Sequence, residues 1–213
     1  MNVNRSDDPP SRVGDPVCPA SWLDGLILAG GQSRRMRTPV APDADKGLRD
    51  WRGRPLVDYV CRYLRGQGID RILISANRHP DAYARYGQVV RDDADLADCG
   101  PLAGILAGLR QARAPWLFVL PVDVIRWPDD LMGRLAQAAS PDHPAYARTP
   151  DGPHPLCLVV HRSSAASLAA FLQSGQRQAQ AWLRDCQARP VDFPDPDCLV
   201  NLNTPEDWSR WEG

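Results

Sequence analysis

Short apolar runs alternate with amphipathic segments along this chain, and this alternation restricts the fold more than any other feature. The predicted strands lie at 26–29, 71–75, 89–90 and 116–120, and predicted helices lie between them at 55–66, 81–86 and 102–110. Such an alternation predicts an α/β fold with a mostly parallel central sheet flanked by helices. The run 116–120 is the most continuously apolar, so we expect it in the centre of the sheet.

The remainder of the chain extends the same pattern. A helix is expected at 127–139, a strand pair at 145–149 and 155–160, helices at 163–172 and 178–189, and a last helix from Thr204 and Pro205. Residues 1–22 are rich in proline and aspartate, which predicts a disordered tail. We therefore expect one Rossmann-like domain, residues 23–213.

Ligands of parallel α/β sheets bind beyond the carboxyl ends of the strands. The turns after Leu28, Ser75, Val90 and Leu120 are therefore expected to meet at one edge. This convergence is the main argument from the residues for a binding site.

The first of these turns contains Gly30 and Gly31, followed by the basic residues Arg34, Arg35 and Lys46. Backbone N–H groups at glycine can approach an anion closely, so the segment fits a phosphate site. A strand end with scattered surface cations is the simpler alternative.

Two nucleotide-binding motifs and one catalytic motif that contain glycine do not match this turn. A P-loop would need Gly-Lys-Ser or Gly-Lys-Thr, and a dinucleotide fingerprint would need a third glycine where Arg34 stands. A nucleophile elbow would need glycine in place of Arg35.

Composition narrows the range of partners. The formal net charge is −1, from 25 basic and 26 acidic residues, so no overall field favours nucleic acid. The six cysteines include no Cys-x-x-Cys pair, and we interpret them as reduced thiols. No apolar run reaches the roughly 18 residues of a membrane span, so we expect a cytoplasmic protein.

Several spaced motifs, taken together, resemble the molybdenum cofactor guanylyltransferases, which join a GMP unit from GTP to molybdopterin. The motifs are LAGGQSRRM at 28–36, DKGL at 45–48, GRPL at 53–56, SANRH at 75–79, GPLAG at 100–104, PVD at 121–123 and NLNTPED at 201–207. The resemblance extends from about residue 26 to 208 and implies a fold of the nucleotide-diphospho-sugar transferase type.

The resemblance also implies roles for particular residues. Asp123, which follows the most buried predicted strand, is the expected Mg²⁺ ligand; a helix-capping aspartate is the alternative. Lys46, the only lysine of the chain, is expected at the triphosphate, and Arg35 at the β- and γ-phosphates or in solvent. Nucleotide contacts are expected from Leu28, Ala29, Gly30, Gly31, Ser75, Asn77 and Asp92, and molybdopterin contacts from Asn201 and Asn203.

The chain also departs from the family pattern. Arg37 replaces a glycine, residues 38–44 lengthen the loop before Asp45, Ser75 replaces an asparagine, and Val124-Ile125 replaces Thr-Pro. Three alternatives stay open: a cytidylyl or sugar-nucleotide transferase, a GTP-binding accessory protein without catalysis, and a purely structural module. Proteins that insert molybdenum or act as molybdoenzyme chaperones are the expected protein partners.

Overall fold

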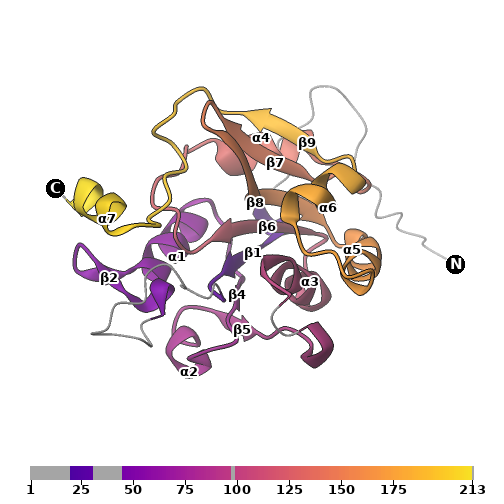
Figure 1. Cartoon of the computed structure of the whole chain (residues 1–213), viewed down its shortest axis with the longest axis horizontal. Helices are drawn as coiled ribbons and strands as arrows, with labels where there is room; N and C mark the ends of the chain where they lie inside the picture. Colours follow the sequence, from indigo (N-terminus) through magenta and orange to yellow (C-terminus); the bar gives the residue numbers. More distant parts are fainter. Residues whose placement is uncertain (1–19, 31–44, 97–98, 213) are drawn as a thin grey trace, which may run out of the picture.

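The computed structural model describes residues 20–30, 45–96 and 99–212, and its centre is a seven-stranded sheet (Figure 1). The strand order is β5-β4-β1-β6-β8-β7-β9. The strands are β1 (Leu23–Leu28), β4 (Ile72–Ser75), β5 (Gln88–Val90), β6 (Trp116–Pro121), β7 (Ala145–Thr149), β8 (Gly152–His161) and β9 (Arg189–Asp192).

The sheet is mostly parallel, as predicted. β1 pairs in parallel with β4 and β6, and β5 pairs in parallel with β4. β8 is antiparallel to both β6 and β7, while β9 is parallel to β7, so β8 alone among the seven runs against the others. The predicted central strand 116–120 is indeed the fourth of the seven.

Helices cover both faces of this sheet. One core cluster contains buried residues of α1 (Leu56–Gly66) and α4 (Leu131–Ala138), together with Trp208 of α7 (Pro205–Glu212). The other contains α3 (Pro101–Gln111), α5 (Ser164–Gln173) and α6 (Ala179–Asp185), which lie on one side in Figure 1. Adjacent β1 residues divide between the clusters, because successive side chains of a strand point to opposite faces.

Three predicted helices are shorter than the sequence pattern indicated, and one of them, expected at 81–86, covers only Pro80–Tyr83. The helix expected at 178–189 ends at Asp185, because Gln187 has a positive φ of 51° and the chain then forms β9 beside β7. The helix expected at 127–139 begins only at Leu131. Of the predicted tail, residues 1–19 lie outside the described residues, whereas Ala20–Trp22 form the 3₁₀ turn η1.

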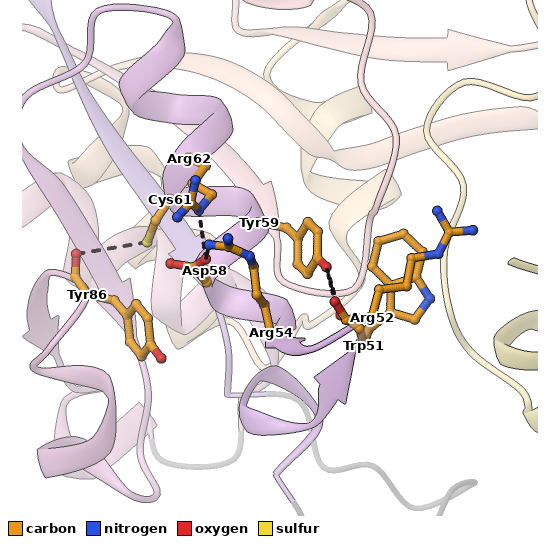
Figure 2. A network of polar contacts seen from close by, with 8 residues as sticks. All are labelled: Trp51, Arg52, Arg54, Asp58, Tyr59, Cys61, Arg62 and Tyr86. Carbon is orange, nitrogen blue, oxygen red and sulfur yellow. Dashed lines mark hydrogen bonds and ion pairs between the residues drawn. The ribbon is translucent and has the colours of Figure 1, made fainter. Parts of the chain in front are cut away.

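A short hairpin that the sequence pattern did not reveal leads into α1. Strands β2 (Asp50–Trp51) and β3 (Arg54–Pro55) are joined by Arg52 and Gly53, whose φ values of 52° and 82° suit a tight primed turn. The Tyr59 hydroxyl donates to the Trp51 carbonyl at 2.7 Å, and Asp58 accepts from Arg54 and Arg62 (Figure 2). These contacts tie the hairpin to α1.

The remaining described elements are the short helix α2 (Pro80–Tyr83) and the 3₁₀ turns η2 (Lys46–Leu48) and η3 (Ala94–Leu96). The cysteines of the described segments are free thiols. Among the helices of these segments, none has both the length and the apolar character needed to cross a bilayer.

Candidate active site

A pocket of about 510 Å³ opens at the carboxyl ends of the parallel strands. Its walls include the ends of β1, β4 and β6 and the residues that follow them, which is the convergence that the sequence predicted. Eight of the predicted site residues line it: Leu28, Ala29, Gly30, Lys46, Ser75, Asn77, Asp92 and Asp123.

Lys46 and Asp123 meet in this pocket although they come from distant segments. The Lys46 ammonium donates to Oδ2 of Asp123 at 2.7 Å and to Oδ1 of Asn203 at 2.9 Å. The two charged side chains are 13% and 24% exposed, so their charges are only partly screened by water. The ammonium of Lys46 thus contacts two other predicted site residues, Asp123 and Asn203.

Main-chain pairing explains why Asn203 reaches this place. The Leu202 N–H donates to the Asp123 carbonyl at 2.9 Å, and Val124 forms an antiparallel bridge with Asn201. The backbone N–H of Asn203 donates to the carboxylate of Asp207, which caps α7 together with Thr204. The segment before α7 is therefore fixed along the chain that follows β6.

A second, smaller pocket of about 190 Å³ adjoins the first. Pro121, Asp123 and Leu156 line both cavities. Residues that line only the second include His154, Asn201 and Asn203. Asp123 therefore stands at the boundary between two neighbouring cavities.

At the other end of the larger pocket, Asn77 and Asp92 form a reciprocal pair. The Asn77 amide donates to Asp92 Oδ2 at 2.7 Å, and the Asp92 backbone N–H donates to Asn77 Oδ1 at 3.1 Å. This arrangement holds a carboxylate in the wall of the pocket and orients it. The neighbouring carboxylate of Asp93 instead pairs with Arg110.

The helix α3 approaches the pocket closely because it carries a glycine. A Cβ atom at Gly104 would lie 2.3 Å from Oγ of Ser75, a buried residue that lines the pocket. Glycine at this position therefore allows α3 to pack closely against the end of β4.

The second pocket also has lining residues from β8 that were not assigned from sequence, among them His154 and Leu156. Leu156 and His154 belong to β8, and they reach this edge only because β8 runs antiparallel to the other strands. Burial lowers the pKa of His154 below its usual value, and its Nε2 lies 2.9 Å from Oγ1 of Thr149. The predicted strand pair at 145–149 and 155–160 could have suggested that β8 is antiparallel. It could not have shown which residues of β8 reach the pocket.

The predicted residues Gly31 and Arg35 lie outside the described residues. In the described segments, no group of three or more His, Cys, Asp or Glu side chains could hold a metal ion. Mg²⁺ commonly takes only one or two carboxylates and completes its shell with phosphate and water oxygens. Asp123, whose carboxylate lines the pocket, therefore fits Mg²⁺ as a single protein carboxylate.

An open α/β sheet with a pocket at its strand ends, where an ammonium meets a carboxylate, is the architecture of nucleotide-binding α/β proteins. Residues 25–191 match the family model of the MobA-like NTP transferase domain. With the relatives described next, this places the chain in the molybdenum cofactor guanylyltransferase family.

Relatives at 38–39% identity carry that family name over nearly their full length. The molybdenum cofactor guanylyltransferase of Shewanella frigidimarina is 38% identical over 190 residues, which cover 88% of this chain and 94% of the relative. The Vibrio vulnificus protein of the same name is 39% identical over 194 residues, or 90% of this chain and 94% of the relative.

Solved structures share the fold at lower identity. Molybdopterin-guanine dinucleotide biosynthesis protein A from Archaeoglobus fulgidus has a TM-score of 0.66 at 22% identity and covers 88% of this chain and 95% of its own. A nucleotidyl transferase from Methanothermobacter thermautotroptrophicus has a TM-score of 0.69 at 19% identity, with 88% and 94% covered. At these identities the likeness shows the fold.

Proposed function

We propose that this protein transfers GMP from GTP to molybdopterin and releases pyrophosphate. The observation that carries this proposal is the contact of Lys46 with Asp123 at the boundary between two cavities. Nucleotidyl transfer brings several anionic oxygens together, so positioning and charge neutralisation do most of the catalytic work. One ammonium and one carboxylate at such a boundary suit that task.

The larger pocket would hold GTP. Backbone groups of Leu28, Ala29 and Gly30 line it, and the Asn77–Asp92 pair supplies an oriented carboxylate. A carboxylate accepts hydrogen bonds, and the N1–H and N2–H₂ groups of guanine donate them. Ser75 adds a hydroxyl in the same wall.

Lys46 would bind the triphosphate. Its ammonium is a compact point charge on a flexible stem, which can follow phosphate oxygens as the reaction proceeds. Gly31 and Arg35, from the preceding loop, are proposed to complete the phosphate site. Asp123 would hold Mg²⁺, which when bound supplies Lewis-acid neutralisation of the phosphate oxygens.

The smaller pocket would hold molybdopterin, with Asn201 and Asn203 as polar contacts. A phosphate oxygen of molybdopterin would form the new bond to the α-phosphorus of GTP. The bond from that phosphorus to the bridging oxygen of the β-phosphate would break, and pyrophosphate would leave. Asp123 and Lys46 lie where the two substrates would meet.

The test is pyrophosphate release from each of the four nucleoside triphosphates, with Mg²⁺ and with or without molybdopterin. We expect release with GTP that depends on both molybdopterin and Mg²⁺. A preference for CTP would assign the protein to cytidylyl transfer. GTP binding without release would favour the accessory role, and no nucleotide binding at all would favour a structural module.

A further inference from the structure

Tyr83 is a fully buried tyrosine that contacts the segment carrying Lys46. It is the last residue of α2, is 0% exposed, and donates its hydroxyl hydrogen bond to Oδ1 of Asp45. α2 follows the turn that holds Asn77 in the pocket wall. Tyr83 therefore links the Asn77 end of the pocket with the Lys46 end.

Asp45 fixes the turn that follows it. Its carboxylate accepts from the Gly47 N–H at 3.0 Å as the N-cap of η2, and its carbonyl accepts from the Leu48 N–H at 3.1 Å. Lys46 is the first residue of η2, so its backbone lies between Asp45 and Gly47, the two residues that this cap joins. The position of the Asp45 carboxylate decides how the turn faces the pocket.

Gly47 brings the turn against both Tyr83 and the residue before Asp123. A Cβ atom at Gly47 would lie 2.4 Å from the Tyr83 hydroxyl oxygen and 2.9 Å from Cγ2 of Val122. No ordinary side chain fits at such distances, so glycine permits this close approach. The turn is thus held from two sides, one of them adjacent to the proposed Mg²⁺ ligand.

The Tyr83 hydroxyl remains a donor under ordinary conditions. Burial, and then the negative charge and hydrogen bond of Asp45, raise the pKa of Tyr83 well above its usual value. The phenol therefore keeps its proton, and the hydrogen bond to the carboxylate is charge-assisted.

We propose that Tyr83 is a positioning residue, which acts through Asp45 to hold the η2 turn so that the Lys46 ammonium points into the nucleotide pocket. The inference rests on the proposed function, because it assumes that Lys46 binds the triphosphate. Neither Tyr83 nor Asp45 lines the pocket itself. Their effect on the substrate must pass through Lys46.

The test begins with Tyr83→Phe, which keeps the ring and removes only the donor. Binding of GTP with Mg²⁺ is measured by calorimetry, and the folded state by thermal unfolding. We expect the Kd for GTP to rise about tenfold, the size of effect that the loss of one hydrogen bond to a charged group produces. Tyr63→Phe is the matched control, because it loses a comparable buried bond, from its hydroxyl to the Pro128 carbonyl at 2.9 Å.

A second pair of variants changes Asp45, the half-buried acceptor of the same hydrogen bond. Asp45→Ala removes the acceptor and should weaken GTP binding as Tyr83→Phe does. Asp45→Asn keeps an acceptor oxygen and should restore most of the affinity. These variants decide the matter even if Tyr83→Phe does not fold.

The decisive comparison is the double variant with Lys46→Ala. If Tyr83 acts through Lys46, then Tyr83→Phe should change the Kd less than twofold in the Lys46→Ala background. Two results would overturn this inference while leaving the proposed function intact. In one, the two substitutions raise the Kd for GTP by factors that multiply in the double variant. In the other, Tyr83→Phe binds GTP with wild-type affinity while Lys46→Ala binds it more weakly. If Lys46→Ala itself binds GTP as the wild type does, the proposed role of Lys46 fails and the inference falls with it.

Discussion

The ammonium of Lys46 lies 2.7 Å from the carboxylate of Asp123, although 77 residues separate them in the sequence. If the two residues have their proposed roles, triphosphate and Mg²⁺ compete with this ion pair. Binding of the nucleotide would then move the ammonium away from both Asp123 and Asn203. Under the proposed function, the ion pair would be the arrangement of these two groups before the nucleotide and Mg²⁺ bind.

Replacement of Lys46 by arginine is expected to reduce activity nearly as much as replacement by alanine. Arginine keeps the charge but presents a planar fork, which does not fit a site shaped for a compact ammonium within 3 Å of two oxygen acceptors. We expect pyrophosphate release to fall at least about a hundredfold in both variants, consistent with the loss of one preorganised charge contact. An arginine variant with near-normal rates would show that charge alone suffices.

Asp123→Asn is expected to shift the Mg²⁺ dependence of the reaction to higher concentrations and to lower the maximal rate. The amide keeps an oxygen ligand but loses the negative charge that a hard cation prefers. Asp123→Glu should retain measurable activity. Asp130→Asn is the matched control, since Asp130 is an exposed carboxylate paired only loosely with Arg134, at 3.7 Å. An unchanged Mg²⁺ titration in Asp123→Asn would remove its role as a metal ligand.

The sequence predicted the parallel half of this fold well, and the reason is local. Strands such as 26–29 and 116–120 are buried on both faces, so each appears as an uninterrupted apolar run. The parallel direction of successive strands follows from the helices that connect them. β9 was missed because Arg189–Asp192 are mostly exposed and stand at the sheet edge. Only pairing with β7 makes them a strand.

The same distinction applies to the site. Leu28 and Ser75 line the pocket because each ends a parallel strand, and Asp123 lines it because it closely follows the end of a third. The direct contact of Asn203 with Lys46 depends on a bridge between two irregular segments, which no periodicity encodes. His154 enters through the one antiparallel strand. Contacts of this kind depend on tertiary packing between segments that are distant in the sequence.

Asn201→Ala is expected to raise the KM for molybdopterin about tenfold while the Kd for GTP stays within twofold, as for the loss of one well-placed polar contact. Asn201 lines only the smaller pocket. Asn203→Ala should affect both substrates, because its side chain also accepts from Lys46. Steady-state kinetics with each substrate varied in turn would separate the two effects. If Asn201→Ala and Asn203→Ala changed the response to GTP equally, the assignment of molybdopterin to the smaller pocket would be contradicted.

The free energy of unfolding is expected to fall as the pH is lowered from about 7 towards 5. Burial lowers the pKa of both His154 and His161 below the usual value, so the unfolded chain takes up protons at a higher pH than the native protein. Acid therefore favours unfolding in this range. Urea denaturation at several pH values should show a smaller pH dependence for His154→Gln, and smaller still when His161→Gln is added. An unchanged slope in the double variant would contradict this explanation.

Gly104→Ala should weaken GTP binding by distorting the wall of the nucleotide pocket. The added methyl group would collide with Ser75, whose Oγ and Cβ atoms would lie 2.3 and 3.0 Å away, so the helix or the strand end must move. Overpacking of this kind costs about 1–3 kcal/mol, which exceeds the roughly 1 kcal/mol that alanine gains over glycine within a helix.

Gly108→Ala is the matched control one turn later in α3. There the methyl group would meet mainly the end of the Leu26 side chain, at 2.7 Å, on the core side of the sheet. We expect both variants to lower the thermal midpoint but only Gly104→Ala to raise the Kd for GTP. The neighbours of Gly104, Ser75 and Leu28, line the pocket, whereas the neighbours of Gly108 do not.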